Sequence, residues 1–279
     1  MTLFKKSHGS KNGLLGLYLW ASVFILGLMS ACAVQTVKIY PDFVQQKQKI
    51  NTMTILCDYY VVDDVKGKVD LVDVPRNLDA AKTAMDALDA QLAAKGYKIV
   101  GKEVASMGLY EKSSTTTYKV AAEKSPASKE EVEKLPLAPP PFYVNKSLFD
   151  SDEKVRALDT VMVKLSAYTR KAGQPVTTIP EATQIRTGYS EDVILFLFMR
   201  GRDVPQGKSI LEGTATALLS LGMFSAYHVS YAAASIYMVD TKTGEIIWAD
   251  GSAGQEMRPS SPKTQGRLFG VITKGMPAR

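Results

Sequence analysis

The chain has 279 residues, of which 46% are hydrophobic and 22% charged, and its net charge is +6. This composition excludes a wholly disordered chain, and the length suffices for a hydrophobic core that needs no disulfide bonds. A basic excess is compatible with binding to nucleic acid or to a membrane surface. The net charge does not show where the charges lie, so their placement along the chain decides whether either partner is indicated.

The amino terminus has the order of a secretory signal. Three lysines precede an uncharged apolar run over residues 13–29, and two small residues then lead to Cys32. Residues 29–32 (MSAC) resemble the lipobox of bacterial lipoproteins, with methionine where that pattern prefers leucine. The resemblance implies that lipid is attached to Cys32, that residues 1–31 are removed as a signal peptide, and that the chain contacts a membrane through this lipid.

An uncleaved membrane helix is the alternative, because extending the apolar run to Val34 gives about the 20 residues that span a bilayer. Both interpretations put the chain at a membrane. Residues 32–51 are rich in Gln and Lys and predict a tether. Cys57 lies in a strand-like run and is interpreted as a small buried apolar residue, so no disulfide is expected.

The first half of the predicted domain is a strand, a helix and a strand. β-Branched and aromatic residues predict a strand over 54–62 and a short second strand ending at Asp73. Apolar residues at intervals of three and four predict a helix over 78–92. We expect Asn77 to cap its start and Gly96 to follow its end, where the next strand begins.

The second half adds a helix, a core strand and a hairpin. A helix is predicted to begin near Ser151. Seven consecutive apolar residues over 193–199 predict a central strand covered on both faces, and residues 201–208 are interpreted as a polar loop after it. The turn over 240–244 (DTKTG) predicts an antiparallel hairpin that ends near residue 249. The fold class is therefore α/β (α+β), with a mixed sheet, an antiparallel C-terminal hairpin and two or three packed amphipathic helices.

Three further segments depart from this regular pattern. A single domain is predicted over 52–252, and residues 119–145 form a flexible insertion with a proline-rich end. Residues 210–227 are small and apolar, and they predict either a crossover packed on the sheet or a helix that faces lipid or another subunit. Residues 253–279 are predicted to form a basic tail, in which 268–272 could dock back as a helix.

The sequence offers few groups for catalysis. His228 is the one histidine left after signal removal, and neither zinc motifs nor phosphate-binding glycine loops occur. His228 is interpreted as structural. The acidic pairs Asp63-Asp64 and Glu130-Glu131 are interpreted as solvated surface. We therefore predict no catalytic, cofactor-binding or metal-binding residue, no cofactor, and Cys32 as the one modified site.

The order of these elements resembles the TolB-amino-terminal-like group of envelope lipoproteins, which includes the curli-secretion channel lipoprotein. The similar parts are 52–104 and 191–251, and the most specific stretch is 239–248 (VDTKTGEIIW). The resemblance implies a non-enzymatic domain that assembles with itself or docks on a secretion, polysaccharide-export or cell-wall machine at the outer membrane. The insertion over 119–145 departs from the compact members of the group. Ala33, rather than aspartate, follows the lipidated cysteine, and the resemblance implies that the chain is retained at the outer membrane.

The charge distribution argues against nucleic-acid binding. Three of the basic residues lie in the signal, and the predicted tail after Glu256 has five basic residues and no acidic one. We therefore predict a lipid-anchored accessory or assembly protein of the bacterial envelope. The alternatives are a membrane-inserting or pore-forming oligomer and, ranked lower, an envelope hydrolase that uses His228.

Overall fold

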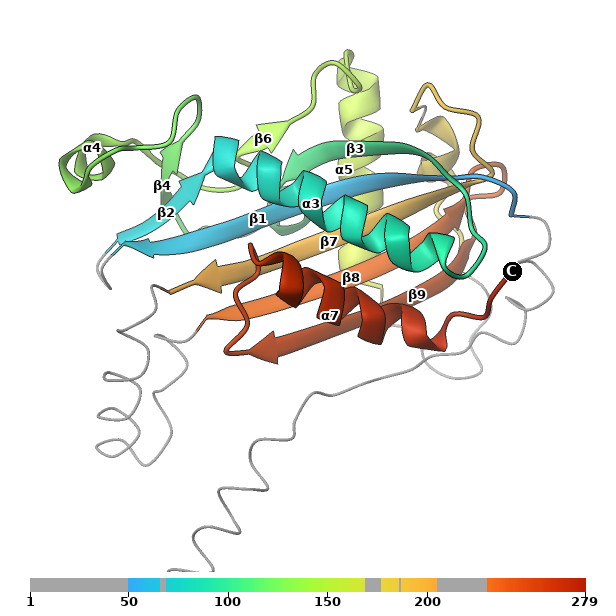
Figure 1. The fold of residues 1–279 in the computed structure, drawn as a ribbon. Coiled ribbons are helices and arrows are strands. Elements are labelled where there is room, and N and C mark those ends of the chain that lie inside the picture. The colour runs from blue at the N-terminus through green and yellow to red at the C-terminus, as the bar shows by residue number, and fades with distance from the viewer. Residues whose placement is uncertain (1–49, 66–68, 169–176, 186, 205–229) are drawn as a thin grey trace, which may run out of the picture. The chain divides into compact units, whose positions relative to one another are not determined.

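The computed structural model describes residues 50–65, 69–168, 177–185, 187–204 and 230–279 (Figure 1). Its strands are β1 (Met53–Val65), β2 (Val69–Asp73), β3 (Ile99–Met107), β4 (Tyr118–Ala121), β5 (Leu137–Ala138), β6 (Tyr143–Val144), β7 (Val193–Asp203), β8 (Tyr231–Asp240) and β9 (Ile246–Gln255). Its helices are α3 (Val74–Ala93), α4 (Lys129–Lys134), α5 (Asp152–Ser166) and α7 (Pro262–Ile272), with short 3-10 turns η2 (Leu109–Glu111), η3 (Pro180–Gln184) and η5 (Thr273–Gly275).

All described strands belong to one mixed sheet. Its order is β5-β4-β2-β1-β7-β8-β9, with β3 also paired to β1 and β6 paired to β3. β1 runs parallel to both β3 and β7, whereas β8 runs antiparallel to its two neighbours β7 and β9. The predicted fold class, a mixed sheet with an antiparallel C-terminal hairpin, is confirmed.

Helices cover both faces of this sheet. α3 and α7 lie side by side across one face, and α5 lies behind the sheet on the other (Figure 1). Leu88 and Leu92 of α3 and Phe269 of α7 are fully buried. The central strand β7 is buried over its first seven residues, as predicted for a strand covered on both faces. Burial of such side chains contributes roughly 1.5–3 kcal/mol each, which makes the sheet the core of the domain.

One edge of β1 is shared between two different strands. β3 pairs with residues 53–58 and β2 with residues 63–65, so the two neighbours diverge between these stretches. The side chain of Asn77 fills the gap, since its amide oxygen accepts from Val61 N at 2.6 Å and its amide nitrogen donates to Val61 O at 3.2 Å. The prediction that Asn77 caps the helix is wrong. Asp73 caps α3 instead by accepting from Arg76 N, because the helix begins four residues earlier than its apolar stripe.

The predicted hairpin is confirmed at the atomic level. Asp240 Oδ1 accepts from the backbone N–H groups of Lys242 and Thr243, both at 2.8 Å. Gly244 has φ +70°, a conformation that glycine adopts without a steric penalty. Gly96 likewise has φ +86° after α3, as predicted. Cys57 is fully buried and unpaired, which confirms its interpretation as a small apolar residue.

Two segments are more structured than predicted. The stretch 119–145 contains most of β4 together with α4, β5 and β6, although it has no apolar period, because short strands at a sheet edge need few buried side chains. The predicted boundary at 253 is not a boundary of the fold. β9 continues to Gln255. The docking of 268–272 as a helix is confirmed, because α7 buries Leu268, Phe269 and Ile272.

Several predictions lie outside the described residues: Cys32 and the signal, nearly all of the tether, the segment 210–227, and His228. Within the described ranges, no helix is long and apolar enough to cross a membrane.

Candidate functional site

Charged side chains gather where β1 and β7 end. These two strands are parallel and in register, so Asp63 lies opposite Asp203 and Val62 lies opposite Arg202. Side chains alternate between the two faces of a strand. The acidic pair therefore projects to the α3 side of the sheet, and Arg202 projects to the other side. The carboxyl ends of parallel strands are where α/β sheets commonly hold ligands.

On the α3 side, two arginines surround Asp203, and we call this group the Asp203 network. Arg76 of α3 pairs with Asp63 at 2.7 Å and with Asp203 at 3.7 Å. Arg258 Nε pairs with Asp203 at 3.2 Å, and the Ser260 hydroxyl donates to the same carboxylate. Asp203 is almost fully buried, so the network ties β1, α3 and β7 to the chain that leads into α7.

The Asp203 network perturbs the titration of Asp63. Burial is the largest cause and raises the pKa of the Asp63 carboxyl to about 6, while Arg76 opposes the rise and Asp203 adds to it. An ionised carboxylate is stabilised by water and by positive charge, and Asp63 is largely shielded from water and shares Arg76 with Asp203. The carboxyl of Asp63 therefore gains a proton at a higher pH than a solvated aspartate.

A cavity of about 430 Å³ opens beside this network, and we call it the carboxyl-end pocket. Its lining combines charged side chains with apolar ones. The lining residues are Asp63, Asp64, Val65, Leu71, Asp73, Arg76, Pro126, Ala127, Ser128, Lys129, Val132, Asp203 and Arg258. The pocket is large enough for a small polar molecule or for a side chain of another protein.

The opposite side of the sheet carries a second group, the tyrosine–arginine face, which consists of Tyr60, Tyr118, Arg200, Arg202 and Tyr231. Arg202 pairs with Asp70 at 2.5 Å, and Arg200 pairs with Glu111. The Tyr60 hydroxyl also donates to Glu111, at 2.5 Å, and burial together with this contact raises the pKa of Tyr60. Tyr231 and Arg200 are exposed to solvent.

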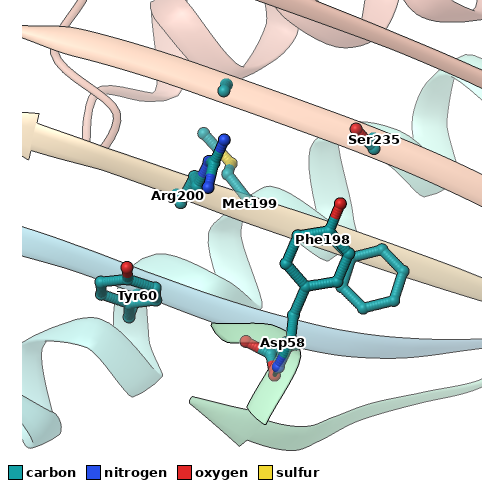
Figure 2. Close-up of a pocket in the computed structure, with 8 residues that line it drawn as sticks. Asp58, Tyr60, Phe198, Met199, Arg200 and Ser235 are labelled. Atoms are coloured by element: carbon teal, nitrogen blue, oxygen red, sulfur yellow. Dashed lines mark hydrogen bonds between the residues drawn. The ribbon is translucent and has the colours of Figure 1, made fainter. Parts of the chain in front are cut away.

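A smaller cavity of about 60 Å³ lies within this face. Figure 2 shows Asp58 and Tyr60 on β1, Phe198 and Arg200 on β7, and Ser235 on β8 around it. The carboxylate of Asp58 is buried, and burial raises its pKa. Its oxygens accept from the Ser106 hydroxyl at 2.8 Å and from the backbone N–H groups of Gly108 and Tyr110 at 2.8 and 3.1 Å. Asp58 thus holds the turn after β3 in place.

Both groups consist of paired charges, and the tyrosine–arginine face adds aromatic side chains. Among the described residues, no group of three or more His, Cys, Asp or Glu side chains could hold a metal ion. Asp58, Asp63, Asp70 and Asp203 all have donor partners. Tyr and Arg are the side chains that protein interfaces favour.

Sequence reasoning missed these residues. The interpretation of Asp63-Asp64 as solvated surface is wrong, since Asp64 is 3% exposed and Asp63 lies in the Asp203 network. The interpretation of 201–208 as a loop is wrong at its start, because β7 continues to Asp203. The available signal was that two strongly apolar runs both end in charged residues, which meet when the strands are parallel. Glu130 and Glu131 belong to the short helix α4 and are exposed, as predicted.

The comparisons with known proteins add little to this geometry. No protein-family model matches the chain, and no curated protein matches it. Among solved structures, the chain is similar to two PelC dodecamers from Paraburkholderia phytofirmans, at 7% and 9% sequence identity. Both alignments cover 83% of this chain and 91% or 90% of the other, with a TM-score of 0.31. A likeness at this level assigns no function to the chain, and membership of the TolB-amino-terminal-like group stays a prediction.

Proposed function

We propose that this chain is a lipid-anchored, non-catalytic protein of the bacterial cell envelope, which acts by docking on or assembling within an envelope machine. The observation that carries the proposal is the order of residues 1–32: lysines, an uncharged apolar run, two small residues and Cys32. Secretion, polysaccharide-export and cell-wall machines are the classes that the resemblance implies.

The described domain fits this role in its chemistry. Its charged side chains at the ends of β1 and β7 are held in ion pairs, and its exposed aromatic and guanidinium groups suit contact with another protein. The chain has two cysteines, and because Cys57 is fully buried within β1, Cys32 is the candidate for modification.

Metabolic labelling with a palmitate analogue tests the anchor. We expect the full chain and the matched control Cys57→Ala to incorporate label, and Cys32→Ser to incorporate none. Label that persists in Cys32→Ser, or that is absent from the full chain, contradicts the proposal.

The intact mass of the purified chain tests the processing step. Removal of residues 1–31 leaves Cys32 as the first residue and adds the mass of the attached lipid. A mass that retains residues 1–31 without lipid would support the uncleaved membrane helix instead.

Pull-down after crosslinking in intact envelopes tests the assembly role. A tagged chain should recover one defined set of envelope proteins or further copies of itself. The charge-removing variant Arg200→Gln should lower this recovery, whereas the matched Arg156→Gln on the exposed side of α5 should not. Equal recovery by both variants argues against the tyrosine–arginine face as the contact surface.

A further inference from the structure

β9 is the last strand of the sheet, and part of its outer edge has no neighbour among the described strands (Figure 1). The beginning of β9 is covered, because Glu245 bridges to Thr178 and Ile246 N donates to Thr177 O at 2.9 Å. From Gly251 to Gln255 no described segment pairs with this edge. We call residues 251–255 the open edge.

The open edge exposes backbone hydrogen-bonding groups. In an antiparallel pair, every second residue directs both its N–H and its C=O away from the neighbouring strand. The N–H of Gly251 donates to the Asp250 carboxylate at 2.8 Å rather than to β8, which indicates that the odd-numbered residues of β9 face outward. Ala253 then presents an outward N–H and C=O.

Apart from the Asp250 carboxylate at the N–H of Gly251, which pairing has to displace, the open edge lacks the features that usually prevent strand addition. Exposed edges are commonly protected by lysine, by proline or by a bulge. The sequence of the open edge is Gly-Ser-Ala-Gly-Gln, with no lysine and no proline. The irregularity in the β8–β9 ladder lies between Met238 and Val239, toward the hairpin turn and away from the open edge.

We propose that the open edge pairs antiparallel with the open edge of a second copy of this chain, around a two-fold axis at Ser252. In this register Gly251 lies opposite Ala253 of the second copy, and Asp250 lies opposite Gly254. Only small side chains then meet, and no like charges are opposed. Moving the axis to Ala253 would place Asp250 opposite Glu256, so the charges select the first register.

This inference extends the proposed assembly role by naming a partner, and it is tested independently of the lipid. The sharpest test is disulfide formation by Ser252→Cys in the full chain carrying Cys57→Ala. Residues directly opposite each other in an antiparallel pair have Cα atoms about 4.5–5.5 Å apart, which suits a disulfide bond. The controls are Cys57→Ala alone and Lys242→Cys in the exposed hairpin turn, in the same background.

We expect oxidation in membranes to give a disulfide-linked dimer of Ser252→Cys at about ten times the level of either control. Equal dimer formation by Ser252→Cys and Lys242→Cys would overturn the proposal. So would a crosslink of the Ser252→Cys variant that joins it only to a protein of different mass. Labelling of Cys32 is measured on the same samples, so loss of the lipid and loss of the dimer are separate outcomes.

A second measurement does not depend on cysteine chemistry. Ser252→Lys places two positive charges opposite each other across the axis, whereas Ser252→Ala keeps the pairing. In sedimentation of the detergent-solubilised chain, the wild type and Ser252→Ala should have the mass of a dimer and Ser252→Lys that of a monomer. Unchanged thermal unfolding of Ser252→Lys confirms that it is folded. A monomeric wild type, or a dimeric Ser252→Lys, contradicts the proposal.

Discussion

The side-chain amide of Asn77 makes two hydrogen bonds to the backbone of Val61, at the point of β1 where one strand neighbour has ended and the next has not begun. Asn77 is itself buried, and its amide nitrogen also donates to Asp73 O at 2.8 Å. A residue of α3 thus replaces a strand in the hydrogen bonding of the sheet.

Replacing Asn77 by leucine should therefore destabilise the domain. The substitution keeps the approximate shape but leaves Val61 N–H and C=O buried without partners, each at a cost of about 1–3 kcal/mol. We expect the free energy of unfolding to fall by about 3 kcal/mol in urea denaturation of the purified chain. Thr83→Ala, on the exposed side of α3, is the matched control and should change it by less than about 0.5 kcal/mol. Equal effects of the two substitutions would contradict this role of Asn77.

The titration of Asp63 predicts a pH-dependent difference in stability. Because the folded-state pKa is raised to about 6 from 3.8, the ionised carboxyl destabilises the folded state above pH 6, and this cost disappears as the pH falls below 4. The shift corresponds to about 3 kcal/mol. The wild type should thus gain stability relative to Asp63→Asn between pH 7 and pH 4. Unfolding free energies measured at four or five pH values check this, and parallel curves for the two proteins would show that Asp63 titrates normally.

Alanine substitutions at two glycines with positive φ distinguish the cost of backbone strain from the cost of a steric clash. Gly244 has φ +70°, and a Cβ there would clash with Ile179 O, whereas Gly188 has φ +83° and open space around it. Alanine at Gly188 should cost about 1 kcal/mol, from the left-handed conformation alone. Alanine at Gly244 should cost at least twice as much. Thermal unfolding of both variants measures the two losses of stability. If Gly244→Ala loses no more stability than Gly188→Ala, the turn relaxes to accommodate the added Cβ.

Helix α7 offers a stabilising substitution. Gly270 lies inside this helix, and a Cβ at that position meets no other atom within 4 Å. Gly270→Ala should raise the free energy of unfolding by about 0.5–1 kcal/mol, since alanine favours helix more than glycine does. Gly201→Ala is the contrasting variant, because its Cβ would clash with Tyr231 O, and it should destabilise. A destabilising Gly270→Ala would show that α7 is not helical around this residue.

The sequence predicts those parts of the fold in which local pattern and tertiary packing agree. The apolar run over 193–199 is typical of a strand covered on both faces, and the DTKTG turn supplies its own capping carboxylate and its own glycine. Their structures match the prediction for these reasons.

The candidate site could not be predicted in the same way, because it depends on which strands become neighbours. Asp63 and Asp203 lie far apart in the chain, and only the parallel register of β1 and β7 makes them a pair. Asn77 shows the same limit on a smaller scale. Its position before an apolar stripe favours capping, but its side chain bonds the backbone of Val61, which lies between the stretches of β1 that pair with β3 and with β2.

The last residue of the chain returns to the first described stretch. Arg279 Nη2 donates to the side-chain oxygen of Asn51 at 2.7 Å, and Arg279 N donates to Lys95 O at 2.9 Å. The first described residues and the C-terminal residue of the domain therefore lie next to each other, at the start of β1. The carboxyl-end pocket lies at the other end of β1. A fusion partner or an affinity tag joined after Arg279 would emerge beside Asn51, at the opposite end of β1 from that pocket. A short linker between Arg279 and Asn51 would allow circular permutation, with new termini placed in the exposed turn around Lys242.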